Sequence, residues 1–323
     1  MKSGKAQRVL IAVVLSVVAG LCGAQTPPEW AYPVNPPGFK PRPDDGAPRR
    51  VPESSASYTL TQLRDRFISP VWHPEEHPPQ PEIVARGRKP DVYACGFCHR
   101  ADGPGGPENA NLMGLPAKYI AQQMADFKSG ARRTAVPGRN TDLMISLARA
   151  ANDAEVGAAA AYFSAIKARA VIRVVETESV PRTYITGWHF ALMGNGEHEA
   201  LGSRIIEVPE VFERFESRDT HARFIAYVPP GSVKKGEALA TSGLGKTVAC
   251  GSCHGPGLVG TADIPGIAGR SPTYLVRQLY EFKHGMRAGP QSAPMKPTVE
   301  NLAVEEMIAL AAYAASLPPR PPD

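Results

Sequence analysis

Two short segments of the sequence carry the side chains best suited to chemistry. Residues 95–99 read Cys-Gly-Phe-Cys-His and residues 250–254 read Cys-Gly-Ser-Cys-His, so both are C-x-x-C-H. On a helical turn, two sulfurs three residues apart lie on one face, where they can form thioethers with the two vinyl groups of one porphyrin. The histidine that follows reaches the iron. The pattern predicts two covalently bound c-type haems, attached through Cys95, Cys98, Cys250 and Cys253, with His99 and His254 as iron ligands.

Cysteine pairs of this spacing have other uses. A bare C-x-x-C also occurs in redox dithiols and zinc sites, and an exported chain with four cysteines can hold two disulfides. The fifth cysteine of the chain, Cys22, lies in the N-terminal segment, so the two motifs leave none over. We favour haem over zinc or a disulfide because a histidine follows the pair both times.

The chain repeats itself around these motifs. A shift of 155 residues superposes them and gives seven identities in the 19 positions from 114 to 132. In each repeat a tyrosine, a glutamine and a phenylalanine recur every four residues, which predicts one helix face that ends at a glycine. The identical pairs are Gly114/Gly269, Tyr119/Tyr274, Gln123/Gln278, Phe127/Phe282, Lys128/Lys283, Gly130/Gly285 and Arg132/Arg287.

One methionine per repeat also falls in register. Met144 is 18 residues before Tyr162, and Met295 is 18 residues before Tyr313. Thioether sulfur suits low-spin iron, and a His/Met pair raises the reduction potential. We therefore predict Met144 and Met295 as the sixth iron ligands, each in a loop followed by an Ala-rich helix. A cap at Asn152 opens the first of these helices; the alternative for each methionine is a place in the core.

These motifs together resemble the di-haem class I cytochromes c, in which two cytochrome c domains are fused. The resemblance runs from C-x-x-C-H through 264–269 and 274–279 to the methionine loop, and covers roughly 82–168 and 232–317. It implies a mainly α fold, with a small helical wrap around each haem, and one-electron transfer without substrate turnover. It also implies a proline carbonyl that accepts the proximal histidine's Nδ1–H; Pro265 matches that place, and Ala110 stands there in the first repeat.

The N-terminus predicts export. Lys2, Lys5 and Arg8 precede an apolar run over residues 9–18, and small residues follow up to Ala24. This pattern is typical of a signal peptide cleaved after Ala24, which places the mature protein in the periplasm. The run is short for a transmembrane helix, so membrane association is expected only through an uncleaved segment or a partner.

Composition bears on the binding partners and on the domain organisation of the chain. The formal net charge is +5, and the first ten residues supply three of these charges, so charge gives no support to nucleic-acid binding. The 323 residues allow two domains, and 33 prolines favour extended connectors. We predict a signal peptide (1–24), a Pro-rich tether (25–57), cytochrome c domain 1 (58–170), a partly β connecting segment (171–229) and cytochrome c domain 2 (230–323).

Three finer expectations concern the parts outside the repeats. The tether could instead be a strap docked along the first domain. The connecting segment is expected to form two or three short strands packed against the haem domains. His73 is expected to be an exposed loop residue, and His221 to lie at the surface or in the core.

The predicted function is a periplasmic electron carrier with no catalytic residues. Single electrons would pass from a donor dehydrogenase or quinol-oxidising complex, through both haems, to an oxidase or reductase. The alternatives are the cytochrome subunit of a periplasmic dehydrogenase complex, and a di-haem peroxidase, which needs a vacant sixth position on one iron. Differences between the repeats, such as Arg100 against Gly255, predict unequal haem potentials.

Overall fold

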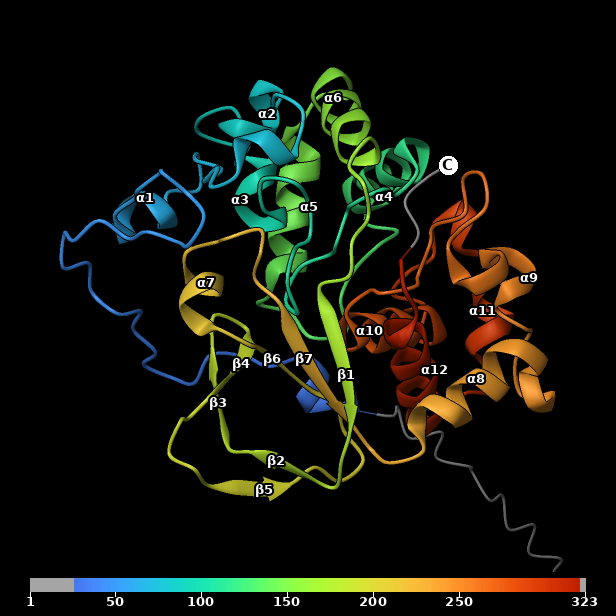
Figure 1. Cartoon of the computed structure of the whole chain (residues 1–323). Coiled ribbons are helices and arrows are strands. Elements are labelled where there is room, and N and C mark those ends of the chain that lie inside the picture. The colour runs from blue at the N-terminus through green and yellow to red at the C-terminus, as the bar shows by residue number, and fades with distance from the viewer. Residues whose placement is uncertain (1–25, 320–323) are drawn as a thin grey trace, which may run out of the picture.

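The fold is known from a computed structural model that describes residues 26–319. The predicted signal peptide, with its cleavage site, lies outside the described residues. Between residues 26 and 319, no helix combines the length and apolar character that a membrane crossing requires. Figure 1 shows two helical bodies with a β-rich segment beside them.

The first helical body contains the first C-x-x-C-H motif. Its helices are α2 (Glu82–Ala85), α3 (Cys95–His99), α4 (Ala117–Ser129), α5 (Asn140–Ala150) and α6 (Asp153–Ser164). The predicted end of α4 is confirmed, because Gly130 follows it in the left-handed conformation at φ 78°. The predicted cap is confirmed as well: Asn152 and Glu155 form a reciprocal capping box at the start of α6.

The second helical body repeats this plan. It contains α8 (Ser232–Ser242), α9 (Gly251–His254), α10 (Pro272–Lys283), α11 (Met295–Val299) and α12 (Val304–Ser316), with 3-10 turns at Gly243–Gly245, Pro256–Leu258 and Pro290–Ser292. Helices α8 and α12 pack closely. A Cβ on Gly236 of α8 would meet the carbonyl of Ala309 on α12, so only glycine permits this crossing.

The connecting segment holds more β-structure than predicted. Within the described chain it forms seven short strands, listed as β1 (Ile172–Glu176), β2 (Ser179–Pro181), β3 (Thr183–Thr186), β4 (His189–Leu192), β5 (His198–Ala200), β6 (Ile206–Pro209) and β7 (Phe224–Val228). β7 is the middle strand of a sheet, parallel to β1 and antiparallel to β6, while β2 pairs with β5 and β3 with β4. The helix α7 (Phe212–Glu216) lies between β6 and β7 in the sequence.

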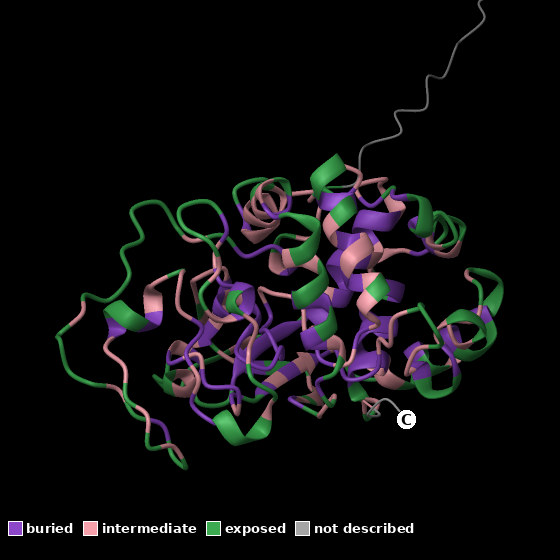
Figure 2. Cartoon of the chain, turned by 90° about the horizontal axis from the view of Figure 1, so that it is seen from above, coloured by how far each residue is buried: buried purple, intermediate pink, exposed green. Residues whose placement is uncertain are grey.

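The Pro-rich arm is docked, which corrects its reading as a free tether. Its 3-10 turn Glu29–Ala31 leads into Ala31 and Tyr32, which are 0% and 2% exposed in the core of the second helical body. The guanidinium of Arg277 donates to the carbonyl of Ala31. The predicted alternative, a strap along the first domain, agrees with the later part of the arm, where Thr61 donates to Asp44 and Val51 packs with Leu60 and Leu63. The start of the arm, in contrast, is anchored on the second helical body. Most of residues 35–50 remain exposed, as the green loops of Figure 2 show.

After the arm, the chain covers the first helical body. The helix α1 (Leu60–Arg64) begins at a capping box on Thr59, and a 3-10 turn follows at Pro74–Glu76. The expectation that His73 is exposed is wrong, because its exposed fraction is 2%. Its burial comes from the connecting segment, which folds over the loop before Pro74, a long-range contact that local sequence could not show.

Candidate haem sites

Both proximal histidines are held in the orientation that iron ligation needs. His99 Nδ1 lies 2.8 Å from the carbonyl of Ala110, and His254 Nδ1 lies 2.8 Å from that of Pro265. A carbonyl only accepts, so Nδ1 carries the proton and Nε2 keeps its lone pair. Burial lowers the pKa of both imidazoles and keeps them neutral. The expected hydrogen bond from His254 to the Pro265 carbonyl is confirmed, and the corresponding bond from His99 to the Ala110 carbonyl has the same length.

The cysteines do not have the character of a redox dithiol. None of the four is in a disulfide, and burial raises the pKa of the Cys95 thiol to about 12. Burial also raises the pKa of Cys98 and of Cys250. Reactive C-x-x-C pairs need a lowered thiol pKa. The sulfurs are therefore suited to stable attachment of a group rather than to disulfide exchange.

One continuous cavity of about 670 Å³ is lined by both C-x-x-C-H motifs and by both predicted methionines. Its mainly apolar wall, which carries two sulfurs, an imidazole and a thioether from each repeat, fits two haems. Neither methionine lies in a loop as predicted: Met144 is in α5, and Met295 is the first residue of α11. Both methionines nevertheless line the cavity.

A third methionine reaches the same cavity. Met124 of α4 lines it, although Leu279 occupies the matching position of the second repeat. The sequence singled out Met144 over Met124 because only Met144 has a counterpart. Met113 and Met307 are 0% and 1% exposed among core residues, as expected for unmatched methionines.

The two repeats meet through a pair of buried arginines. Arg132 donates through Nη2 to Tyr274 Oη and Gln278 Oε1, both at 2.9 Å. Through Nη1 it donates to Gln123 of its own repeat at 2.8 Å. Arg132 therefore links Gln123 of its own repeat to two residues of the other repeat.

The second arginine makes the same contacts in reverse. Arg287 donates to Gln278 of its own repeat at 3.0 Å and to Gln123 of the other at 2.7 Å. It also donates to Tyr119 at 3.4 Å. In the sequence these residues are identical pairs in the repeat alignment, and nothing there indicates that they contact each other. The contacts form because the two repeats pack together about an approximate two-fold axis.

The cavity wall between the repeats carries excess positive charge. Five arginines line it, Arg132, Arg139, Arg270, Arg277 and Arg287, against four acids, of which Glu281 is buried and Glu108, Glu155 and Asp263 are not. Burial favours a raised pKa for Tyr119, yet Arg287 and Arg132 overcome it and lower that pKa. Uncompensated buried charge is costly. Haem brings two propionates, so this wall fits the acidic edge of a haem on each side.

The two sites differ in how they are covered. Arg218 of the connecting segment donates to the carbonyls of Phe97 and Leu63, and its guanidinium lies 3.7 Å from the centre of the Phe97 ring. Arg100 is buried and Arg218 is half-buried, and both lie near Cys98. In the second site Cys253 is exposed. Nearby Leu244, Val248 and Ile264 are exposed apolar residues of the same domain.

Comparison with known proteins agrees with this geometry. The chain is 28% identical over 235 residues to the "Thiosulfate dehydrogenase electron acceptor" of Thiomonas intermedia, covering 72% of this chain and 82% of that protein. It is 25% identical over 229 residues to "Cytochrome c4" of Pseudomonas aeruginosa, covering 69% and 83%. Cytochrome c-554(547) of Halothiobacillus neapolitanus is 36% identical over 84 residues, which are 23% of this chain and 92% of that protein. The chain belongs to the di-haem class I cytochromes c.

No protein-family model matches this cytochrome. Its relatives bear out the expected fold of two helical cytochrome c domains, two covalently bound c-type haems and a role in electron transfer. The connecting segment with its seven strands was visible in the sequence only as apolar runs. Arg132 and Arg287 were visible in the sequence only as identical residues at matching positions of the two repeats.

Proposed function

We propose that this protein is an exported electron carrier in which Cys95/Cys98 and Cys250/Cys253 attach the haems. His99 with Met144, and His254 with Met295, are the axial ligand pairs. The observation that carries this proposal is the single cavity lined by all eight residues. Each haem, when bound, supplies an iron that takes up and releases one electron.

The residues of the chain then set how electrons move. The carbonyls of Ala110 and Pro265 hold the proximal imidazoles, and the arginines between the repeats would supply cationic partners for haem propionates. Two haems in one continuous cavity need no partner for the electron to pass between them. With both irons capped by methionine, no position is left for a substrate, so we propose a carrier rather than an enzyme.

Partner docking is proposed at the second site. Cys253 is exposed, as are the apolar Val248 and Ile264 that line the same cavity and Leu244 earlier in the chain, whereas the connecting segment covers the first motif through Arg218. Exposed apolar residues beside a redox centre suit a transient interface that excludes water. Electrons would enter and leave through this edge.

The donor is proposed to be a dehydrogenase of thiosulfate. The relative from Thiomonas intermedia, named as an electron acceptor of such an enzyme, matches over most of both chains. The test mixes the purified, oxidised cytochrome with a thiosulfate dehydrogenase and thiosulfate, and follows haem reduction by rapid mixing. Fast reduction that Val248→Glu slows, with an unchanged spectrum, is expected. Reduction no faster than without the enzyme would contradict this donor.

The alternative is that this chain is a fixed subunit of a dehydrogenase complex. It is supported by the same relative from Thiomonas intermedia and by the docked N-terminal arm. Gel filtration of the two proteins together separates the proposals. A transient carrier elutes apart from the enzyme, and a subunit elutes with it at stoichiometric ratio.

A further inference from the structure

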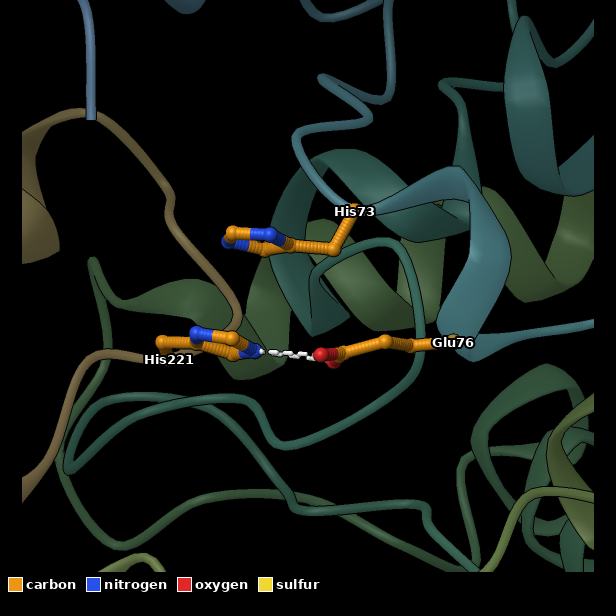
Figure 3. A group of neighbouring side chains, drawn as sticks. All are labelled: His73, Glu76 and His221. Atoms are coloured by element: carbon orange, nitrogen blue, oxygen red, sulfur yellow. Dashed lines mark hydrogen bonds and ion pairs between the residues drawn. The ribbon is translucent and has the colours of Figure 1, made fainter. Parts of the chain in front are cut away.

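A cluster outside the haem cavity combines two imidazoles and a carboxylate. His73, Glu76 and His221 each place one potential ligand atom within 4.8 Å of the others (Figure 3). His73 and Glu76 flank the turn after α1, and His221 belongs to the turn before β7. The cluster thus joins the N-terminal cover to the connecting segment, in parts of the chain that the haem repeats do not include.

The buried histidine is oriented by a carboxylate. His73 Nε2 lies 3.0 Å from Asp219 Oδ1, and Asp219 is 1% exposed. Arg214 donates to the other oxygen of Asp219 at 2.8 Å, so both oxygens of this carboxylate have a partner. Because a carboxylate only accepts, His73 Nε2 carries the proton and Nδ1 is left as a lone pair. A carboxylate that fixes the far nitrogen of an imidazole is the arrangement found behind metal-bound histidines.

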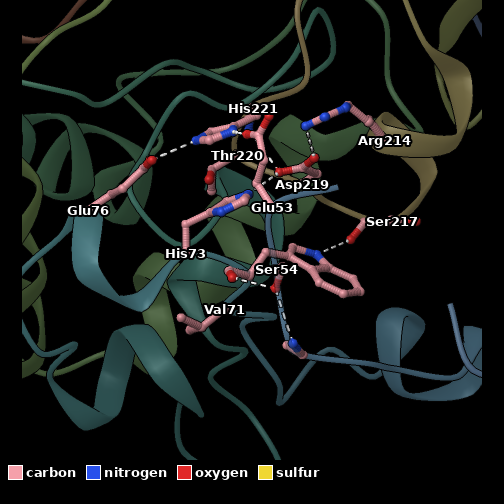
Figure 4. A network of polar contacts seen from close by, with 12 residues as sticks. Glu53, Ser54, Val71, His73, Glu76, Arg214, Ser217, Asp219, Thr220 and His221 are labelled. Atoms are coloured by element: carbon pink, nitrogen blue, oxygen red, sulfur yellow. Dashed lines mark hydrogen bonds and ion pairs between the residues drawn. The ribbon is translucent and has the colours of Figure 1, made fainter. Parts of the chain in front are cut away.

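The second histidine has the same kind of support. His221 Nε2 lies 2.8 Å from Glu76, and His221 Nδ1 lies 3.5 Å from Glu53 on the opposite side. Figure 4 shows these acids around the two rings. The side chains of His221 and Glu76 are 26% and 39% exposed, and both line a cavity of about 650 Å³ that gives an ion access.

We propose that His73, Glu76 and His221 bind a zinc ion, with Asp219 and Glu53 as the supporting carboxylates. Two imidazoles, one carboxylate and a water complete the four-coordinate geometry that zinc takes. The rings of His73 and His221 stack with centroids 3.8 Å apart and planes at 7°. Ligation requires His221 to turn out of this stack, which its exposed position permits, while buried His73 stays in place.

A bound zinc ion would hold in place the part of the connecting segment that covers the first haem site. Arg218, which donates to the carbonyl of Phe97 in the first motif, is one residue from Asp219 and three from His221. Zinc between the turn at 219–221 and the loop at 73–76 would tie this cover to the first domain without touching either haem.

The test is calorimetric titration of zinc into the haem-loaded protein after chelator treatment. The loaded protein is used because its motif sulfurs and imidazoles are then occupied. One zinc per chain is expected, with affinity at least about tenfold weaker in His221→Ala and in Glu76→Gln. His198→Ala and Glu75→Gln, which change an exposed histidine and the acid next to Glu76, are expected to bind as the wild type.

Haem spectra and thermal unfolding complete the test. Zinc is expected to raise the unfolding temperature of the wild type and not that of His221→Ala, with identical haem spectra in both. No zinc binding by the wild type, or equal binding by His221→Ala and Glu76→Gln, would overturn the proposal. Neither result bears on electron transfer, which depends on other residues.

Discussion

Arg132 and Arg287 lie opposite each other in an isolated antiparallel bridge where the two haem domains meet. Each guanidinium donates to a glutamine of its own repeat and to the helix face of the other. Because the two residues match in the internal repeat, the interface is built twice from one motif. The cavity wall that carries them is also where haem propionates fit.

The first prediction concerns this interface. Arg287→Gln removes three charge-assisted hydrogen bonds, to Tyr119, Gln123 and Gln278, which costs about 2 kcal/mol although both glutamines still accept from Arg132. Chemical denaturation of the haem-loaded protein measures this loss. Arg133→Gln, an exposed neighbour of Arg132, is the control and is expected to unfold as the wild type. Equal stability of Arg287→Gln and the control would count against a structural role for the pair.

The second prediction tests the sixth ligands. Met144→Ala and Met295→Ala are each expected to remove half of the methionine-to-iron charge-transfer absorbance in the near red, and to lower the potential of one haem. Met124→Ala, which also removes a thioether from the cavity wall, is the control and keeps the full band. Loss of the band in Met124→Ala with retention in Met144→Ala would reassign the first ligand.

The third prediction gives the order of the two potentials. Half-buried Arg218 and buried Arg100 lie near Cys98 of the first motif, and nearby cations favour the less positive, reduced iron. The first haem is therefore expected to have the higher potential. Arg218→Gln is expected to lower it by about 60 mV, a tenfold change for a one-electron couple.

A matched variant makes that titration decisive. Arg182→Gln changes an arginine of the exposed hairpin, which bonds Glu197, and is expected to leave both potentials unchanged. Two waves of equal potential in the wild type, or a shift of the same size in both variants, would refute the electrostatic asymmetry.

A fourth prediction follows from a buried acid. Glu207 of β6 is 1% exposed, and burial raises its pKa although Ser271 and Thr273 donate to it. The folded protein holds this proton to higher pH than the unfolded chain. Stability from Glu207 is therefore present below its unfolded pKa and declines as pH rises through the folded value.

Thermal unfolding across pH 4 to 8 measures this effect. The decline with rising pH is expected to flatten in Glu207→Gln, which keeps an uncharged acceptor in the same place. Glu305→Gln, an exposed glutamate on α12, serves as the control and should follow the wild-type curve. An unchanged slope in Glu207→Gln would show that the carboxyl does not titrate in this range.

The sequence predicted what local pattern determines. The motif turns, the end of α4 at Gly130 and the cap at Asn152 depend on neighbouring residues, and the structure has them as expected. Placement of Met144 and Met295 as cavity residues followed from the repeat alignment, although their helical state did not. Helix α5 begins at Asn140 and so includes Met144, for which a loop was predicted.

Long-range packing accounts for what was missed. The strands of the connecting segment are three to five residues long, too short for a clear alternation. Burial of His73, docking of Tyr32 and the contact of Arg132 with Tyr274 each join residues more than 140 positions apart. No local pattern encodes such contacts.

The intact mass of the purified protein under denaturing conditions tests the central claim most directly. The account predicts a chain that carries two covalently bound haems, one of which is lost in the Cys95→Ala/Cys98→Ala variant and the other in Cys250→Ala/Cys253→Ala. A mass equal to the bare polypeptide, or one haem retained when both cysteines of its motif are replaced, would contradict it.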